Sequence, residues 1–360
     1  DVGPKLEQAR RLFEAGKFEQ ARAALQRILA ASPGNADASS AMAVVLTQLG
    51  LHEQALFHAQ RAAETRPQDA GVLANLGNSL GILKRYAEAR AAFERALEAA
   101  PDLTVARVGL VSTLRSMAEF SAAMEHLREA MRQNPEDAAL PPLEAALLIN
   151  MGRAHEAVER AREWRQKWPR NAMLASVVAN AINYDQGASP GEVLAAHREY
   201  GELVTAGVKE RLPAPVNVKD AERPLRVGLL SYDLKQHSVA YFVEPVLRHL
   251  HRARFSVMCY STSEKEDAVS ARLKSLASGW RAVAGLDDAA LAKKIRSDGI
   301  DVLIETSGVT LGHRLGVMAM RPAPVQVTWC GYPNTTGLSA VDYRIVDSRT
   351  DPAGAEAWCV

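Results

Sequence analysis

The segment NLGNSLGILKRYAEARAAFERALEAAP, residues 75–101, shows the pattern that governs the first half of the chain. Its last residue is one of five prolines that recur every 34 residues without a break: Pro33, Pro67, Pro101, Pro135 and Pro169. An alanine lies twelve residues before each proline: Ala21, Ala55, Ala89, Ala123 and Ala157. A second repeated position, in the turn before each of these alanines, is Gly16, Gly50 and Gly152 in three copies, and Lys84 and Ala118 in the other two. This regularity predicts a stack of similar structural units.

A 34-residue period with a turn glycine and a closing proline is typical of tetratricopeptide repeats, each of which is a helix–turn–helix hairpin. Glycine ends the first helix because it tolerates positive φ, and proline stops the second because it cannot continue the backbone hydrogen bonds. Small residues such as Ala89 let the two helices approach closely, and Phe93 fills the space beside them. We predict five repeats over residues 1–171, stacked into a superhelix whose concave surface binds proteins.

Composition narrows the class of protein. The 360 residues are 48% hydrophobic, and 43 basic residues balance 42 acidic ones to a net charge of +1. This balance gives no reason to expect a nucleic-acid partner, and no segment approaches the roughly 20 apolar residues of a membrane span. The three cysteines, Cys259, Cys330 and Cys359, form no CxxC pair, which favours a reducing, cytoplasmic setting without a disulfide framework. The histidines show no metal-ligand spacing, so we predict no metal site.

The pattern changes after Pro169. We predict linker helices over residues 172–222 and a separate domain over residues 223–360. In that domain, short apolar runs alternate with helical segments. The runs predict strands at 225–232, 255–260, 281–285, 301–306, 325–331 and 343–347, and the intervening segments predict helices at 239–251, 268–278, 287–298 and 311–320. This alternation is typical of a parallel, doubly wound sheet.

Ligands of such sheets bind beyond the carboxyl ends of the strands, so the loops that follow the strands hold the candidate site. Glycines and small hydroxyl residues there suit phosphates or sugars, because free backbone N–H groups can face the ligand. The chain has neither a GxGxxG nor a P-loop motif, which excludes an ordinary dinucleotide or P-loop site. His237 is either catalytic or a packed or capping histidine, and His313 is a helix-start or surface residue. The candidate substrate-binding residues are Asp233, Gly308, Thr310, Cys330, Gly331, Tyr332, Pro333 and Thr335.

Two motifs in these loops resemble one family. SYDLKQHSVAYF (Ser231–Phe242) and RPAPVQVTWCGYPNTTG (Arg321–Gly337) are similar to segments of O-linked N-acetylglucosamine transferases, and especially of their bacterial homologues. Tetratricopeptide repeats placed ahead of such a domain complete the resemblance. It implies a GT-B fold, in which two Rossmann-like lobes enclose the active site. It also implies transfer of N-acetylglucosamine from UDP to serine or threonine hydroxyls of acceptor proteins, with inversion and without a metal or other cofactor.

The resemblance also assigns roles to residues. His237 matches the active-site histidine proposed as the base, so it is the catalytic candidate. Thr310, Cys330 and Gly331 match positions that line the sugar and diphosphate pocket. The chain departs from the family pattern at four positions: Ser238, Tyr241, Val309 and Asn334. The first two change the setting of His237, and the last two bear on which sugar is accepted.

Two other functions stay open at this stage. A glucosyltransferase of the same wider family that modifies asparagine shares the RPAPVQVTW motif, and a repeat-based binding module can carry an inactive lobe. The sequence contains a single sheet, so we expect the second lobe, with most of the nucleotide contacts, to lie outside this chain. On that expectation the chain alone binds UDP weakly or not at all and does not catalyse transfer.

Overall fold

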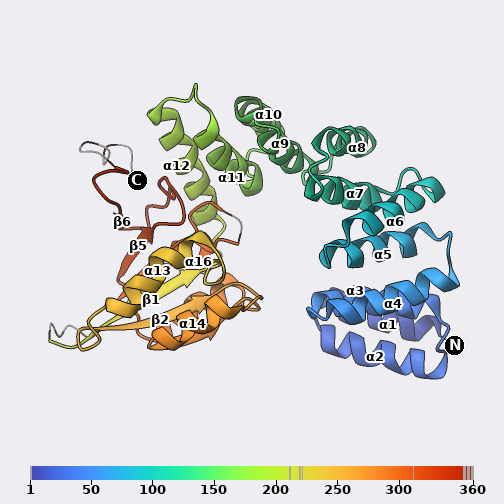
Figure 1. Ribbon diagram of the computed structural model, residues 1–360, viewed down its shortest axis with the longest axis horizontal. Coiled ribbons are helices and arrows are strands. Elements are labelled where there is room, and N and C mark those ends of the chain that lie inside the picture. The colour runs from blue at the N-terminus through green and yellow to red at the C-terminus, as the bar shows by residue number, and fades with distance from the viewer. Residues whose placement is uncertain are drawn as a thin grey trace. The chain divides into compact units, whose positions relative to one another are not determined.

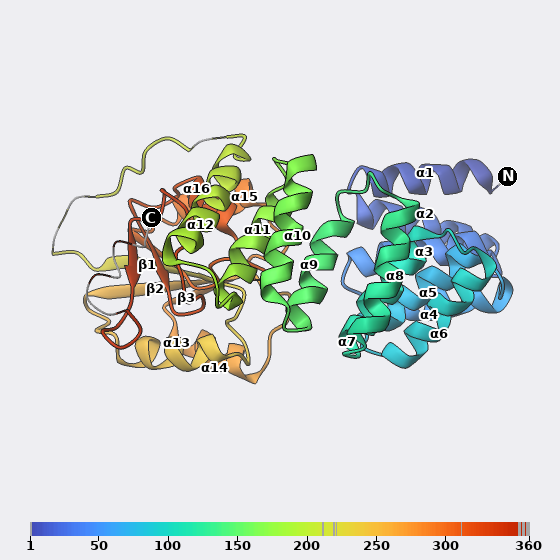
Figure 2. The same ribbon diagram turned by 90° about the horizontal axis from the view of Figure 1, so that it is seen from above.

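The computed structural model describes residues 2–210, 212–218, 220, 222–310, 312–351, 354 and 357. Contacts within the chain divide it into two compact units, residues 1–152 and 153–360. Within the described residues, the first unit consists of helices joined by turns, and the second combines helices with a parallel sheet (Figures 1 and 2). The predicted combination of a helical repeat array with an α/β domain is therefore confirmed.

The first unit is a series of helical hairpins. Its helices are α1 (Gly3–Glu14), α2 (Phe18–Ala31), α3 (Ala36–Gln48), α4 (His52–Thr65), α5 (Ala70–Ile82), α6 (Tyr86–Ala99), α7 (Thr104–Ser116), α8 (Phe120–Gln133) and α9 (Leu140–Asn150). The pairs α1–α2, α3–α4, α5–α6 and α7–α8 pack as four complete repeats, and each pair also packs against the next. The fifth predicted repeat is divided, because α9 belongs to the first unit and its partner in the pattern, α10 (Ala154–Lys167), belongs to the second.

The periodic small residues lie where the helices of a repeat meet. Four of the alanines that precede the prolines in this unit, Ala21, Ala55, Ala89 and Ala123, are all at most 1% exposed. Phe93 is equally buried, and its ring lies against two glycines of the neighbouring helices α5 and α7. A Cβ on Gly77 would come within 2.8 Å of that ring, and one on Gly109 would overlap it. Glycine at these two positions therefore makes room for the phenylalanine.

The turn between the two helices of each repeat uses left-handed backbone. Gly16 and Gly50 have φ of 70° and 73°, and Lys84 and Ala118, at the equivalent positions, both have φ of 61°. The shared geometry confirms that these non-glycine residues occupy the glycine position of the repeat. A left-handed conformation costs an L-amino acid roughly 1–2 kcal/mol, whereas glycine adopts it freely.

Ala118→Gly is therefore expected to stabilise the protein by about 0.5–1 kcal/mol, since the strain that is relieved exceeds the extra freedom that glycine gives the unfolded chain. The measurement is the shift of the first unit's thermal transition in calorimetry of the whole chain. Gly50→Ala is the reverse control and should lower the same transition. A lower transition for Ala118→Gly would show that the turn is not strained.

The second unit is built on a six-stranded parallel sheet. The strands are β1 (Leu225–Ser231), β2 (Phe255–Ser261), β3 (Gly279–Ala282), β4 (Val302–Glu305), β5 (Val325–Trp329) and β6 (Tyr343–Ile345). They lie in the order β3-β2-β1-β4-β5-β6 and every neighbouring pair is parallel. This is the strand order of a doubly wound nucleotide-binding sheet. The strands β1 to β3 are added toward one edge and β4 to β6 toward the other, so the order reverses between β1 and β4.

Helices cover both faces of the sheet. They are α13 (Ser238–His249), α14 (Ala268–Leu276), α15 (Asp288–Ser297) and α16 (Leu315–Ala319), preceded by α11 (Ala172–Ala181), the 3-10 turn η1 (Ile182–Tyr184) and α12 (Pro190–Ala206). Leu229 faces the core formed with α13 and α14, and its neighbour Leu230 faces the core formed with α12, α15 and α16 (Figure 2). Because both faces are covered, the central strands are continuous apolar runs instead of alternating ones.

Two of the segments predicted in this unit differ from the structure by more than two residues at one end. β3 covers 279–282 and not 281–285, because it pairs with the carboxyl half of β2 from Met258 onward. α16 is limited to five residues of the predicted helix at 311–320. Residues 312–314 before it are not helical, and Leu311 lies outside the described residues. In the predicted linker region, α12 runs from Pro190 to Ala206, and a capping box between Ser189 and Glu192 fixes its start.

Residues 321–326, the RPAPVQ part of the motif, hold the segment between β5 and β6 in place through side-chain hydrogen bonds. The Arg321 guanidinium donates to the carbonyl of Ala340 and to the carboxylate of Asp342, and the buried Gln326 amide donates to the carbonyls of Met318 and Ala340. These bonds hold the segment between β5 and β6 against the end of α16. The motif therefore positions β6 and the loop before it.

Candidate active site

Three loops meet at the carboxyl edge of the sheet, on both sides of the point where the strand order reverses. They follow β1 (232–237), β4 (306–314) and β5 (330–338). Close backbone contacts join them. A Cβ on Gly331 would overlap the carbonyl of Thr306 and lie 3.2 Å from Val239, and a Cβ on Gly308 would overlap the ring of Tyr332. The glycines of the candidate site thus allow the loops to touch.

His237 lies at the N-cap of α13, directly beyond β1. Its Nδ1 accepts a hydrogen bond from the backbone amide of Val239 at 3.3 Å, so the structure gives His237 the capping role that the sequence left open. The same Nδ1 is 3.8 Å from a carboxylate oxygen of Asp233. The imidazole is 43% exposed, so its other nitrogen, Nε2, is available to a ligand. The catalytic role of His237 remains a prediction.

Asp233 is the second candidate of the first loop and is largely buried. Burial raises the pKa of Asp233, and the positive charges of His237 and Lys235 act in the opposite direction. Lys235 itself lies over the ring of Tyr232, with Nζ 3.7 Å from the ring centroid, and donates to Ser263. The loop therefore presents a cation, an imidazole and a carboxylate at one edge of the sheet.

The second loop is held by a buried carboxylate that the sequence analysis did not single out. Glu305, the last residue of β4, is 2% exposed. It accepts hydrogen bonds from the amides of Ser307 and Gly308, both at 2.9 Å, and from the Thr328 hydroxyl of β5 at 2.5 Å. Burial raises the pKa of Glu305, and these three donors oppose the rise. Glu305 thus fixes the loop that carries Gly308 and Thr310.

The third loop contains candidates with two different kinds of environment. Cys330 has left-handed backbone, with φ of 53°, and burial raises the pKa of its thiol to about 12, so the thiol is neutral at physiological pH. Cys330, Gly331, Tyr332 and Pro333 border a pocket of about 570 Å³. Tyr332 and Thr335 are buried, and the Tyr332 hydroxyl is bound by linker-helix residues. Tyr332 therefore anchors the third loop to the linker helices.

The 570 Å³ pocket extends from β5 to β6 and includes residues that the sequence analysis did not name. Phe242 of α13 forms one wall. Arg344 of β6 forms another and is held by Asp351 at 2.7 Å and by the carbonyl of Pro333 at 2.8 Å. Asp347 belongs to the same lining, as expected for the segment after the last strand. The pocket has the size and mixed polarity of a small-molecule site.

Thr306 is a further residue that sequence reasoning missed. Its hydroxyl is fully buried between the second and third loops and, within the described residues, has no hydrogen-bond partner. A buried polar group without a protein partner marks a place for water or a ligand group. His313 is partly buried and lies two residues before the start of α16. Its Nδ1 accepts from the Leu315 amide at 3.4 Å and its Nε2 is 3.0 Å from the Tyr200 hydroxyl, so it is the helix-start residue of the two alternatives expected for it.

Neither a metal cluster nor a membrane span is found in the described part of the chain. No three His, Cys, Asp or Glu side chains there come together as possible metal ligands. None of the described helices has the length and apolar character needed to cross a bilayer.

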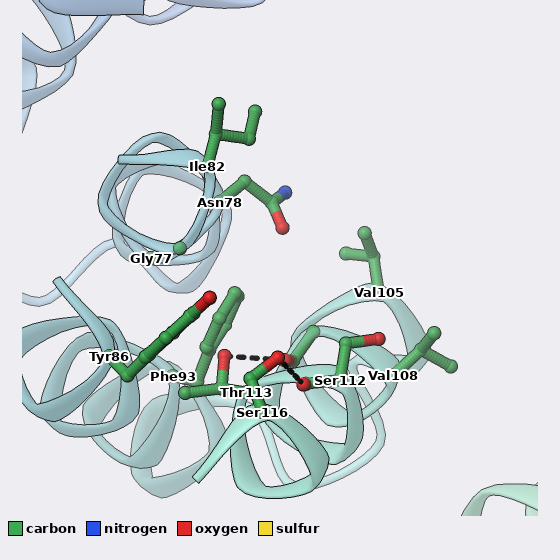
Figure 3. A pocket seen from close by; sticks show the side chains of 12 residues that line it. Gly77, Asn78, Ile82, Tyr86, Phe93, Val105, Val108, Ser112, Thr113 and Ser116 are labelled. Carbon is green, nitrogen blue, oxygen red and sulfur yellow. Dashed lines mark hydrogen bonds between the residues drawn. The ribbon is translucent and has the colours of Figure 1, made fainter. Parts of the chain in front are cut away.

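The first unit contains a second candidate site, on the inner helices of the third and fourth repeats (Figure 3). This pocket of about 340 Å³ has apolar walls formed by Phe93, Val108 and the exposed side chains of Ile82 and Val105. Asn78 and hydroxyl groups lie at its rim. Glycines at three lining positions keep the space open: Gly77, Gly81 and Gly109. Such a surface suits a peptide that inserts an apolar side chain.

The two units define a class of protein in which a tetratricopeptide array is followed in the sequence by a doubly wound α/β domain. Comparison with known proteins gives the same class. Residues 202–358 match the model of glycosyl transferase family 41, and residues 12–77 and 83–147 match a tetratricopeptide repeat model. In solved structures, the chain is similar to a mutant O-GlcNAc transferase of Thermobaculum terrenum, with a TM-score of 0.71 and 29% identity over 81% of this chain and 56% of that one.

Curated plant proteins give the same result. An Arabidopsis thaliana protein named "Probable UDP-N-acetylglucosamine--peptide N-acetylglucosaminyltransferase SPINDLY" is 44% identical over 176 residues, which are 48% of this chain and 19% of that protein. The SEC protein of the same plant, with the same enzyme name, is 33% identical over 139 residues, or 38% of this chain and 14% of that protein. The chain therefore spans a small part of these relatives. Its homology to O-GlcNAc transferases, which the motifs implied, is confirmed.

Proposed function

We propose that the protein transfers N-acetylglucosamine from UDP-N-acetylglucosamine to serine or threonine hydroxyls of proteins, with inversion and without a metal. The observation that carries this proposal is the meeting of three loops at the reversal point of the sheet, with His237 on the first and the GYPNTTG segment on the third. The enzyme names of the homologues point to the same reaction. We also propose a cytoplasmic location, in keeping with the cysteine usage.

Each loop has a part in the proposed reaction. His237 Nε2, at the amino end of α13, takes the proton of the acceptor hydroxyl or orients the donor. The second loop, with Gly308 and Thr310, contacts the sugar. The third, with Cys330 and Gly331, contacts the diphosphate, for which the backbone amides and small residues leave room. The pocket in the repeats holds part of the acceptor protein before its hydroxyl reaches His237.

The decisive experiment offers the full-length gene product each candidate donor and acceptor. Mass spectrometry of acceptor peptides incubated with UDP-N-acetylglucosamine is expected to show N-acetylhexosamine on serine or threonine, and an excess of EDTA should not reduce it. Hexose from UDP-glucose on asparagine would instead establish the asparagine-directed alternative. Absence of transfer to any peptide or protein, with retained peptide binding, would favour a binding module.

We further expect UDP to bind the full-length protein with an affinity that this chain does not reach. The reason is that the described residues form one sheet and the sequence has neither a GxGxxG nor a P-loop motif, so the chain offers few of the phosphate contacts that a nucleotide needs. Calorimetric titration of UDP into both proteins measures the difference. Equal micromolar affinity in the two would show that the loops described here are sufficient for UDP binding.

A further inference from the structure

The linker helix α12 approaches the third loop so closely that no side chain fits between the two backbones. A Cβ on Gly201 of α12 would overlap the carbonyl of Gly337, and a Cβ on Gly337 would overlap the carbonyl of His197. Gly337 has φ of 74°, so glycine is needed there for its backbone conformation as well. The linker helix and the GYPNTTG segment are therefore packed backbone to backbone, with no side chain between them.

His197 lies at this contact and is completely buried. Its Nδ1 is 2.7 Å from the carbonyl oxygen of Val193, and its Nε2 is 2.7 Å from the Tyr332 hydroxyl. A carbonyl only accepts, so Nδ1 carries a proton. Burial lowers the pKa of His197, which favours the neutral ring, so Nε2 is an acceptor. The Tyr332 hydroxyl can donate to Nε2 at 2.7 Å or to the carbonyl of Ala179 at 3.1 Å, and Nε2 is the nearer acceptor. The hydrogen-bond geometry thus selects one tautomer.

The network continues from Tyr332 to the neighbouring loop residues. Asn183 donates its amide to the Tyr332 hydroxyl at 2.7 Å, and its own carbonyl oxygen accepts from the Asn334 amide at 3.0 Å. The Asn334 oxygen in turn accepts from the amide of Thr335 at 2.8 Å. The Asn183 amide also donates to main-chain carbonyls of α11, one of which lies 3.1 Å from the Tyr332 hydroxyl, so the network ties the third loop to that helix. Asn334, one of the four departures from the family pattern, thereby gains a structural role.

From this geometry we infer that His197 and Asn183 are positioning residues that hold Tyr332, and with it the substrate-facing residues 330–335, in the conformation that the proposed transfer requires. This inference rests on the proposed function. Neither residue touches the pocket at the carboxyl edge of the sheet, so they act through the loop and not on the substrate. A loop displaced by about 1 Å can reduce a rate about 10²-fold, so loss of the network should markedly lower the rate of sugar transfer.

The test combines kinetics of the full-length protein with spectroscopy of this chain. We expect Tyr332→Phe and His197→Phe each to lower kcat/KM for the sugar donor about 10- to 100-fold. The double variant should resemble Tyr332→Phe, because that change already removes the bond to His197. His197→Gln retains an acceptor near the position of Nε2 and should recover most of the activity. In nitrogen-15 spectra of this chain, His197 should be neutral with its proton on Nδ1, and Tyr332→Phe should shift the Nε2 resonance.

Tyr260→Phe is the matched control. It also removes a buried tyrosine hydroxyl, bound to Asp298 at 2.8 Å, but it lies outside the three loops. Its activity should stay within about 3-fold of wild type, as expected for a purely structural hydrogen bond. Wild-type activity in Tyr332→Phe, or a proton on Nε2 of His197, would overturn the inference. A wild-type protein that transfers no sugar would refute the proposed function, and the spectra would still decide whether the network exists.

Discussion

Replacing His237 by alanine in the full-length protein is expected to lower turnover about 10²- to 10⁴-fold, which is the usual contribution of a general base. The structure places this imidazole at the reversal point of the sheet with one nitrogen, Nε2, free for a ligand. In the observed state Nδ1 accepts the amide of Val239. A neutral ring of this tautomer carries its proton on Nε2, where it can donate to a donor-substrate oxygen.

To act as a base, Nε2 must first lose that proton, and Nδ1 must then carry one. Asp233 is the group that can accept the Nδ1 proton in a hydrogen bond, and at 3.8 Å a small rotation of the ring brings the two together. The base role therefore requires the ring to exchange its bond to Val239 for one to Asp233. The orienting role requires no such change. Asp233→Asn should accordingly lower kcat if His237 is the base, whereas loss of a substrate contact alone would raise KM.

His237→Asn separates catalysis from capping. Asparagine is a good N-cap residue, and its side-chain oxygen can accept the Val239 amide in place of Nδ1, while nothing replaces Nε2. If Nε2 takes part in the reaction, the asparagine variant should be as inactive as the alanine variant. If Nε2 is the base, that variant should also lose the acidic limb of the pH–rate profile, with its UDP affinity within a few-fold of wild type. Near-normal turnover in His237→Asn would mean that His237 is only a cap and that the active-site assignment is wrong.

The elements that sequence analysis predicted well are those whose signals are local. The prolines and the turn glycines recur every 34 residues because each repeat has the same turn and the same helix end, and Lys84 and Ala118 adopt the turn conformation even without glycine. The position of the candidate loops also followed from a general rule, since the carboxyl ends of parallel strands must share one edge of the sheet.

The supports of the loops were not predictable because they depend on contacts between distant parts of the sequence. His197 and Tyr332 are 135 residues apart, and nothing in the local pattern of α12 indicates that a histidine there meets a tyrosine of the third loop. The residues of the motif that carried the resemblance also have two different roles, one structural and one at the pocket. Arg321 and Gln326 clamp the segment before β6, whereas Cys330 and Gly331 border the pocket.

Glu305→Ala is expected to destabilise the second unit by about 3–5 kcal/mol, because it leaves three buried donors without an acceptor at roughly 1–3 kcal/mol each. Those donors are the amides of Ser307 and Gly308 and the hydroxyl of Thr328, so the second loop should also lose its conformation. Chemical denaturation of this chain, followed by tryptophan fluorescence from Trp280 and Trp329, measures the stability. A loss below about 1 kcal/mol would show that water or a neighbouring group replaces the carboxylate.

Glu305→Gln is the matched control, because its geometry can satisfy the same partners. The Gln oxygen can accept from the amides of Ser307 and Gly308, and its NH2 group can donate to the Thr328 hydroxyl, which is able to accept. We expect a loss of about 1 kcal/mol or less at neutral pH.

Burial raises the pKa of Glu305 above its ordinary value of 4.5, so the folded state binds this proton more tightly than the unfolded state does. Stability from Glu305 therefore falls as pH rises through 4.5 toward the folded-state pKa, and the advantage of wild type over Glu305→Gln should shrink in the same direction. An advantage that instead grows with pH would mean that the three donors outweigh burial and that the carboxylate is stabilised in its charged form.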